Sequence, residues 1–225
     1  MMELRPVSQA VEDYVKAIYL LEQSEGKVTT KALALALDVA PPSVTAMIKR
    51  LHAMHLARYT RYRGVTLTAA GKRMALEVVR HHRLLELYLV EAMGLPWDQV
   101  HDEAERLEHV ISEELEERIA ELLGHPVTDP HGDPIPTKEG ELEQPAYVPL
   151  NELSPGTDAI IKRIADQSPD KLRYLGNLGL FPKVKVTLLE KAPFGGPMSL
   201  KVGGTRCTLG EELARQIYVH PVQAR

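Results

Sequence analysis

Histidines and glutamates gather on one side of a helix that the sequence predicts between His101 and Glu121. His101, Glu105, Glu108 and His109 lie at spacings that bring side chains to one face of a helix. Imidazole nitrogens and carboxylate oxygens are ligands that suit a divalent ion such as Mn²⁺, Fe²⁺ or Zn²⁺. A solvated acidic helix face would look similar, so both interpretations stay open on this stretch alone.

The composition is that of a globular protein. The chain has 225 residues, of which 44% are hydrophobic and only 5% aromatic, and it contains a single cysteine, Cys207. One cysteine cannot form an internal disulfide, which fits a reducing compartment. No stretch has the length of a signal peptide's apolar segment or the ~18 apolar residues of a membrane span. We therefore expect a cytoplasmic protein without a membrane partner.

Charge is distributed unevenly along the chain. Residues 27–90 hold 11 Lys/Arg and 3 Asp/Glu, whereas residues 101–123 hold 2 and 9, although the net charge of the whole chain is only −4. The basic block suits an anion such as nucleic acid, and the acidic, histidine-bearing block suits a cation.

The basic block has the pattern of a helix-turn-helix. A first helix from Val7 to Ser24 is followed by a short helix after the cap candidates Thr29 and Thr30, and then by a turn at residues 40–43 with two prolines. Proline is favoured in the first turn of a helix, so the next helix begins there. The candidates for contact with DNA are the outward residues of this helix, which could enter the major groove, and two residues before them: Thr30, Pro42, Ser43, Thr45, Ala46, Lys49 and Arg50.

A basic hairpin follows the second helix. Residues 56–62 and 65–68 are rich in β-forming side chains and flank Arg63-Gly64, with Arg61 and Tyr62 at the tip. A helix-turn-helix followed by such a hairpin predicts a winged helix whose wing contacts phosphates or the minor groove. A small helical bundle with an ordinary basic surface is the less favoured alternative.

The next helix, predicted over Thr68 to Met93, has apolar residues on more than one face. Helices of this kind are usually buried on both sides. A homodimer interface is therefore expected, and dimers pair naturally with palindromic DNA sites. His82 and Glu86 are four residues apart and share a face of this helix.

The last third of the chain differs in composition. A segment dense in Pro, Gly and Asp, residues 124–149, predicts a linker, in which we expect His125 and His131 to be surface residues. From Leu150 to Arg225 the strand-like runs AIIKRI, VKVTLLEK, MSLKVGG and ARQIYV predict a small β-barrel of about five strands, with a short helix or turn at residues 174–180. The fold class is thus mainly α with a C-terminal β-barrel.

These motifs together resemble a known family. The segments VEDYVKAIYLLE, PPSVTAMIKRL, YRGVTLTAAGK, RHHRLLE, VHDEAERLEHVISEELEERI and GHPVTDPHGDPIP are similar to the metal-dependent repressors related to diphtheria toxin repressor and the manganese transport regulators. The resemblance covers essentially the whole chain. It implies a winged-helix DNA-binding domain over residues 1–73, a helical dimerisation and metal-binding domain with its linker over 74–149, and an SH3-like domain over 150–225.

The resemblance also implies two metal sites. The primary site would comprise Asp13, Glu105, Glu108 and His109, with His82 close by, and the second would comprise His82, Glu86 and His101 plus groups from the C-terminal domain. Iron-type members have a cysteine where this chain has Glu105 and a methionine where it has Asp13. Carboxylates are harder ligands than sulfur, so Mn²⁺ is expected, with Fe²⁺ as the alternative and Zn²⁺, Co²⁺ or Cd²⁺ as substitutes in vitro.

Three departures from the family pattern stand out. Lys16 replaces a glutamate of the short manganese regulators, which argues against a two-manganese cluster of that kind. Ser168 and Lys171 replace the Glu and Gln ligands of the second site, for which Asp166 or Asp170 could substitute. Ala46 replaces a base-contacting glutamine, so the operator sequence is expected to differ.

The function expected is a metal-activated homodimeric regulator of metal homeostasis genes that binds double-stranded operator DNA and no small-molecule substrate. A winged-helix regulator that responds to a non-metal signal is the alternative, and metal-independent operator binding would favour it. A metalloenzyme is disfavoured. ERLEH is close to the peptidase order H-x-x-E-H, but Glu105 stands in the first histidine's place.

Overall fold

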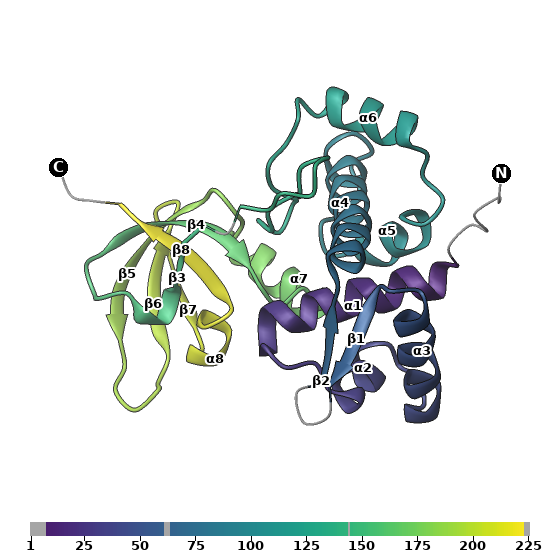
Figure 1. Cartoon of the computed structure of the whole chain (residues 1–225). Helices are drawn as coiled ribbons and strands as arrows, with labels where there is room; N and C mark the ends of the chain where they lie inside the picture. Colours follow the sequence, from purple (N-terminus) through teal and green to yellow (C-terminus); the bar gives the residue numbers. More distant parts are fainter. Residues whose placement is uncertain (1–7, 61–63, 144, 223–225) are drawn as a thin grey trace. The chain divides into compact units, whose positions relative to one another are not determined.

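A computed structural model describes residues 8–60, 64–143 and 145–222. The chain folds into two compact units. The first comprises residues 1–82, 107–112 and 136–141, and the second comprises residues 83–106, 113–135 and 142–225. The helices and strands of both units are labelled in Figure 1.

The first unit contains the predicted helix-turn-helix. Helix α1 (Gln9–Glu25) ends at Gly26, whose φ of 70° is the left-handed conformation expected of a helix C-cap. Helix α2 (Thr30–Ala36) begins where the Thr29 hydroxyl accepts a hydrogen bond from the Ala32 amide. Helix α3 (Pro41–Ala53) starts at the two prolines, and α2 and α3 are bent by 108° at their break. This angle is typical of a helix-turn-helix.

The wing is a two-stranded hairpin. Strands β1 (Ala57–Thr60) and β2 (Gly64–Leu67) pair antiparallel, and Val65 also bridges to Val28. Gly64 has a φ of +90°, and a Cβ there would lie 2.2 Å from the carbonyl oxygen of Val28. Only glycine fits this close approach. The three residues at the hairpin tip, Arg61, Tyr62 and Arg63, lie outside the described residues.

Helix α4 (Ala69–Glu91) runs unbroken as predicted, but the central helix does not. The structure divides it into α5 (His101–Leu107) and α6 (Glu113–Leu122), with a turn between them. The prediction of one helix from residue 101 to 121 is therefore wrong. Ser112 and the acidic first turn of α6 are the residue types that favour a new helix start. The apolar residues Leu107, Ile111, Leu115 and Ile119 keep helical spacing through the break, and this spacing predicts one continuous helix.

The exposed apolar side chains lie on α6 rather than on α4. Leu84, Leu85, Leu87 and Leu89 of α4 are all buried within the single chain. On α6, Leu115 and Leu122 are 52% and 67% exposed, whereas Ile119 of the same helix is buried. Of these two helices, α6 is therefore the one that leaves large apolar side chains exposed.

The second unit contains an antiparallel sheet with strand order β3-β8-β4-β5-β6-β7. Its elements, in chain order, are β3 (Val148–Pro149), the 3-10 helix η1 (Leu150–Glu152), β4 (Asp158–Ile164), α7 (Pro169–Asn177), β5 (Lys185–Lys191), β6 (Met198–Val202), β7 (Thr205–Leu209), α8 (Glu211–Ala214) and β8 (Ile217–Pro221).

Alternating side chains of this sheet form one apolar core, which includes Ile161, Leu188 and Leu200. The run ARQIYV is a strand only from Ile217, because α8 occupies the residues up to Ala214. The short helix lies at residues 169–177, a few residues earlier than predicted. Strands β3 and β7 stand at the two ends of the pairing order, so the predicted closure into a barrel stays a prediction.

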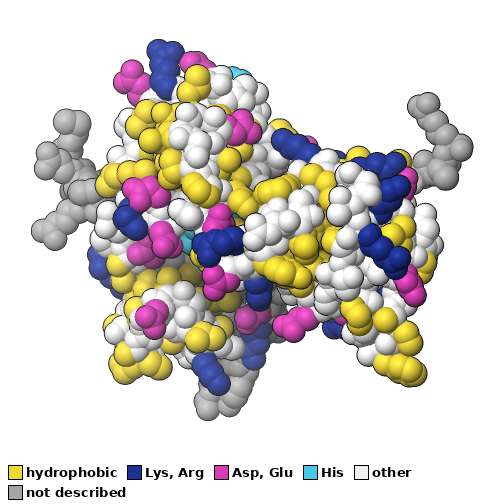
Figure 2. Space-filling model, turned by 180° about the vertical axis from the view of Figure 1, so that it is seen from behind, with side chains coloured by type: hydrophobic (Ala, Val, Ile, Leu, Met, Phe, Trp, Pro, Cys, Tyr) yellow, Lys and Arg dark blue, Asp and Glu magenta, His cyan; other side chains and the backbone are white. Residues whose placement is uncertain are grey.

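The surface carries charges of both signs. On the face drawn in Figure 2, Lys and Arg side chains are interspersed with Asp and Glu. Within the described ranges, no single helix is long and apolar enough to cross a membrane, although the bent pair α2 and α3 passes the same test by length and composition.

Candidate metal centre

A buried carboxylate lies at the centre of a charged cluster in the first unit. Glu108, in the turn after α5, is 1% exposed. Its oxygens accept hydrogen bonds from the Lys16 ammonium at 2.7 and 2.9 Å, and one of them lies 2.5 Å from Nδ1 of His82. Lys16 also lies 3.2 Å from that His82 nitrogen. Helix α1, helix α4 and the turn thus meet at one carboxylate. We use the name Glu108 cluster for Glu12, Asp13, Lys16, His82, Glu108 and His109.

His109 connects the turn to the other acidic side chains of α1. Its Nδ1 lies 2.7 Å from Oε2 of Glu12, and its Nε2 lies 2.8 Å from Oδ1 of Asp13 and 3.4 Å from Oε1 of Glu108. The His109 side chain is 6% exposed, whereas that of Asp13 is 39% exposed. The cluster therefore has one open side, at Asp13.

Asp13, Glu108 and His109 fit a divalent metal ion. One ligand atom from each lies within 4.8 Å of the others. Two carboxylate oxygens and one imidazole nitrogen form a donor set that suits Mn²⁺, Fe²⁺ or Zn²⁺. Glu12 beside Nδ1 of His109 would fix the orientation of the ring, as carboxylates commonly do for metal-bound histidines.

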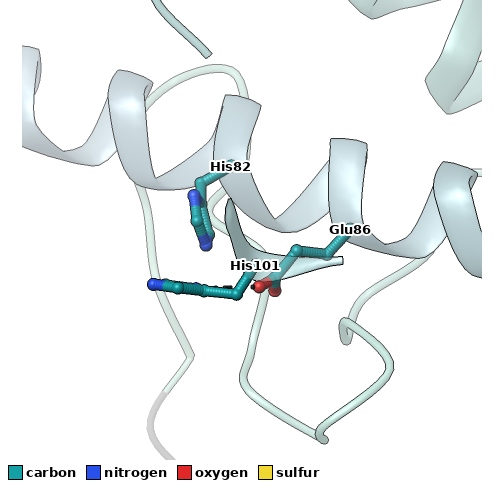
Figure 3. Close-up of side chains that lie close together, drawn as sticks. All are labelled: His82, Glu86 and His101. Atoms are coloured by element: carbon teal, nitrogen blue, oxygen red, sulfur yellow. Dashed lines mark hydrogen bonds and ion pairs between the residues drawn. The ribbon is translucent and has the colours of Figure 1, made fainter. Parts of the chain in front are cut away.

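A second pair of predicted ligands lies in the second unit. Nδ1 of His101, the first residue of α5, is 3.2 Å from Oε1 of Glu86 on α4. Glu86 is 1% exposed, and the His101 side chain is 48% exposed. Figure 3 shows this pair, with His82 one turn before Glu86 on α4. Glu105 lies one turn after His101, 3.9 Å from its Nε2.

The C-terminal candidates for the second site make other contacts. Asp166 accepts hydrogen bonds from the Ser168 hydroxyl and the Lys171 ammonium. Asp170 lies 3.4 Å from a nitrogen of Arg173, and its side chain is 97% exposed. Neither aspartate belongs to a cluster of three metal-ligating groups among the residues that the structure describes.

The DNA-contacting candidates on α3 point into solvent. Pro42, Ser43, Thr45, Ala46, Lys49 and Arg50 are all exposed, and Thr30 at the start of α2 is half-buried. Val44, Ile48 and Leu51 on the opposite face of α3 are buried. The helix thus exposes a polar, basic face to solvent and packs its apolar face into the core, as a recognition helix requires.

Two features of the site were missed by the sequence reasoning. Glu12 is adjacent in sequence to Asp13, yet only the position of His109 reveals its role. His131 was expected at the surface, and that expectation is wrong, since the side chain is 0% exposed. The density of acidic groups around it in DPHGDP was the available signal, because such groups can hold a buried imidazole by hydrogen bonding and charge.

Comparison with known protein families gives three consecutive matches. Residues 7–65 match the N-terminal DNA-binding domain of iron-dependent repressors, residues 68–137 match their metal-binding and dimerisation domain, and residues 148–221 match the FeoA domain.

Individual relatives agree with these matches. The iron-dependent repressor IdeR of Mycobacterium leprae is 34% identical over 224 residues, which cover 94% of this chain and 96% of that protein. The regulator MntR of Oceanobacillus iheyensis is 40% identical over 103 residues, which cover 46% of this chain and 69% of that protein.

Solved structures give the same assignment. A manganese-dependent transcriptional repressor in complex with manganese has a TM-score of 0.85 and 38% identity, covering 94% of this chain and all of that chain. ScaR with bound Zn²⁺ has a TM-score of 0.76 and 36% identity, covering 94% and 99% of the two chains. The chain belongs to the family of metal-dependent transcriptional repressors that includes diphtheria toxin repressor, IdeR and MntR, a family of DNA-binding regulators and not of enzymes.

Proposed function

We propose that this chain is a manganese-activated repressor of metal homeostasis genes, and that the Glu108 cluster is its metal switch. The observation that carries the proposal is the meeting of Asp13 from α1 with Glu108 and His109 from the turn after α5. These residues come from distant parts of the sequence, so an ion bound among them would join the DNA-binding helices to that turn.

The donor set supports Mn²⁺ as the activating ion. Asp13 and Glu108 offer oxygen, and His109 offers nitrogen. Glu105, which the family pattern adds to this site, also offers oxygen. Oxygen-rich sites suit Mn²⁺, whereas sulfur ligands favour softer ions. Fe²⁺ is the alternative physiological ion, and Zn²⁺, Co²⁺ and Cd²⁺ are expected to substitute in vitro.

Lys16 supports a single ion at this site rather than two. Its ammonium lies 2.7 Å from Glu108, where it supplies one positive charge to a carboxylate that would otherwise be shared between metal ions. A second ion at the same carboxylate would meet like-charge repulsion from the ammonium.

His82, Glu86 and His101 are proposed as the ligands of a second site. The Glu86–His101 contact and the one-turn spacing of His82 from Glu86 support it. Asp166 and Asp170 contact basic groups of their own, and we do not assign them to this site.

The exposed face of α3 would read the operator. Ser43, Thr45 and Ala46 would face base edges, and Lys49 and Arg50 would contact phosphates. Thr30 and Pro42 would contact the backbone, as would Arg61, Tyr62 and Arg63 at the wing tip. A homodimer formed through α6, where Leu115 and Leu122 are exposed, would present two such helices to a palindromic operator in the cytoplasm. The functional domains would span residues 1–73, 74–149 and 150–225.

The residues of the cluster suggest how binding is switched. When bound, the ion supplies positive charge that offsets repulsion between the carboxylates of Asp13 and Glu108. Glu12 would hold the imidazole of His109 in the orientation that keeps Nε2 available. Asp13, through its place on α1, would then fix the helices that carry the DNA-reading face.

A gel-shift experiment on the protein's own promoter region tests the proposal. Parallel lanes would contain chelator, Mn²⁺, Fe²⁺ or Zn²⁺, with wild-type protein and His109→Ala. The proposal predicts a shift only with metal, strongest with Mn²⁺ and lost in His109→Ala. His125→Ala, which removes an exposed loop histidine, is the matched control and should bind like wild type. Equal binding in chelator would contradict the proposal and favour a non-metal signal.

A further inference from the structure

The segment between α4 and α5 contains a tryptophan and a buried aspartate that neither proposed metal site uses. Trp97 is half-buried, and Asp98 is 8% exposed. A tight turn holds the segment, because the Gln99 amide donates a hydrogen bond to the Pro96 carbonyl at 2.9 Å. His101, a proposed ligand of the second site, begins α5 shortly after Asp98. The contacts of Trp97 and Asp98 therefore bear directly on the position of His101.

The buried carboxylate of Asp98 forms an ion pair with Arg173 of α7. Nε of Arg173 donates a hydrogen bond to Oδ2 of Asp98 at 3.1 Å, and a terminal guanidinium nitrogen lies 2.9 Å from the same oxygen. The other terminal nitrogen lies 3.4 Å from Asp170, about one turn earlier on α7. Burying a carboxylate is costly unless a counter-charge accompanies it. Helix α7 thus supplies the charge that offsets the cost of burying Asp98.

The Trp97 indole packs against α7 and the core of the C-terminal sheet. Its ring centroid lies 4.9 Å from that of Phe181, with the ring planes tilted by 53°. A Cβ at Gly176 of α7 would lie 3.2 Å from the indole nitrogen, so the ring lies directly against the helix backbone. Trp97 also packs against the apolar core of the sheet, which includes Leu175 and Leu180. An apolar side chain from the segment before α5 thus covers part of that core.

His131 fixes Trp97 from a third direction. Its ring stacks on the indole with centroids 5.6 Å apart, and its Nε2 donates to the Trp97 carbonyl oxygen at 2.9 Å, because a carbonyl can only accept. Oδ1 of Asp129 accepts a hydrogen bond from the His131 amide at 2.8 Å, and Gly132 allows the turn with a φ of +89°. The Ile164 amide of β4 donates to the His131 carbonyl at 2.8 Å. Trp97 is therefore held through a rigid loop that is itself bonded to the sheet.

Apolar contacts and the ion pair contribute differently to this docking. Burial of the Trp97 ring is favourable but non-directional, so it would tolerate small rotations of α7. The ion pair is directional, because a rotated α7 would leave Asp98 buried without the Arg173 guanidinium. Charge pairs of this kind commonly fix the register of a contact whose attraction comes from apolar burial. The two together favour one orientation of the sheet on the segment before α5.

We propose that Trp97, Asp98 and Arg173 form a clasp that docks the C-terminal sheet on this segment without a metal ion, and that the docking positions His101 beside Glu86. The positioning half of the inference rests on the second metal site proposed above. Asp166 and Asp170 contact basic groups of their own, so the sheet would act on that site by placing His101. Arg173, which acts through Asp98, is a positioning residue.

Fluorescence tests the clasp directly, because Trp97 is the only tryptophan of the chain. The emission maximum and acrylamide quenching would be measured on full-length protein, in chelator and with Mn²⁺. Wild-type Trp97 should be equally shielded in both conditions, whereas Arg173→Met should shift the emission to longer wavelength and increase quenching in both. Arg206→Met is the control, since Arg206 is a similarly exposed arginine that pairs with Glu190 on the sheet. Shielding of wild-type Trp97 that appears only with Mn²⁺, or wild-type quenching in Arg173→Met, would overturn the clasp.

A charge exchange separates the ion pair from a general loss of structure. The double variant Asp98→Arg/Arg173→Asp should recover shielding relative to either single variant, because the exchanged charges can still pair. A double variant whose Trp97 is as exposed as in the single variants would overturn the part assigned to the ion pair.

Equilibrium dialysis against Mn²⁺ tests the positioning of His101. Arg173→Met should bind its second ion about tenfold more weakly than wild type, as expected when a group that orients a ligand is lost. Arg206→Met should bind like wild type. Exposed Trp97 together with wild-type affinity in Arg173→Met would overturn the positioning role. His101→Ala should lose the same ion. If it kept every ion, the proposed second site would fail, and the fluorescence result would still decide the clasp.

Discussion

Glu108 and Glu86 are both buried carboxylates, and they face different basic groups. Glu108 has the ammonium of Lys16 at 2.7 Å as well as the imidazole of His82 at 2.5 Å. Glu86 lies beside the imidazoles of His101 and His131, at 3.2 and 3.6 Å. An ammonium keeps its charge at neutral pH, whereas an imidazole can give up its proton to make room for a metal ion. We therefore expect a metal ion at Glu108 to bind beside a second positive charge, that of Lys16. A metal ion at Glu86 would have only imidazoles as basic neighbours.

The largest expected effect comes from removing the charge of Glu108. In Glu108→Gln the buried Lys16 ammonium loses the Glu108 carboxylate that lies 2.7 Å from it, which should lower the free energy of unfolding by about 3–5 kcal/mol. Glu86→Gln should cost less, about 1–3 kcal/mol, because the amide oxygen can still accept a hydrogen bond and the neighbouring imidazoles lie at 3.2 and 3.6 Å. Urea unfolding in chelator measures both. The double variant Glu108→Gln/Lys16→Met should recover most of the stability that Glu108→Gln loses. Equal losses of stability in Glu108→Gln and Glu86→Gln would contradict the difference between the two carboxylates.

Lys16→Met tests whether the Lys16 ammonium lowers the affinity of Glu108 for a metal ion. Without the ammonium, Glu108 can give its full charge to the ion, so Mn²⁺ affinity should rise about tenfold, or about 1.4 kcal/mol. The variant should also be less stable than wild type in chelator and should gain more thermal stability on adding Mn²⁺. Thermal unfolding with and without Mn²⁺ gives both the stability in chelator and the Mn²⁺ affinity. Lys31→Met, at an exposed lysine of α2, is the control. An unchanged Mn²⁺ affinity in Lys16→Met would show that the Lys16 ammonium does not compete with Mn²⁺ for Glu108.

Lys49 offers a test in the first unit away from Glu108. Lys49→Ala should weaken operator binding by about 1 kcal/mol and reduce the slope of log affinity against log salt by about 1, because one phosphate contact is lost. Mn²⁺ affinity without DNA should not change. Fluorescence anisotropy at several salt concentrations measures the slope. Lys201→Ala, at an exposed lysine of β6, should leave the slope unaltered, and an equal effect of both variants would remove α3 from the interface.

The smallest effect concerns Glu22, a carboxyl of α1 that accepts a hydrogen bond from the Leu67 amide. Burial raises its pKa above the ordinary 4.5, against the opposing effects of the Leu67 amide and Lys72. A raised pKa means that the stability this group contributes is present below pH 4.5 and is lost as pH rises through the folded-state pKa. Glu22→Gln should therefore be more stable than wild type at pH 7, by under about 0.5 kcal/mol given its partial exposure. Chemical unfolding at pH 4 and pH 7 measures the difference, and a larger gain at pH 4 would contradict the burial effect.

Much of the first unit could be predicted from local sequence signals. Thr29 and the prolines at residues 41–42 mark helix starts through a cap and fixed backbone angles, and both starts are confirmed. The turn at residues 108–112 could not be seen by periodicity, because the apolar spacing continues through it. Yet this turn is what brings Glu108 and His109 to α1, so the metal cluster depends on the feature that periodicity misses.

Long-range contacts account for the rest. Lys16 contacts Glu108, which is 92 positions away in the sequence, and His131 lies near Glu86. Local sequence patterns do not predict such contacts. His131 was expected at the surface because isolated loop histidines usually are. Its burial follows from the turn that Asp129 and Gly132 impose, which is a tertiary property.

If the Glu108 cluster is the metal switch, metal binding there and DNA binding at α3 are coupled. The most direct measurement is the Mn²⁺ affinity of wild-type protein and His109→Ala with and without operator DNA. Coupling is reciprocal, so operator DNA should tighten Mn²⁺ binding by about 1–3 kcal/mol, roughly 5- to 150-fold, in wild type. In His109→Ala this gain should disappear. An Mn²⁺ affinity that is the same with and without DNA in wild type would contradict the claim.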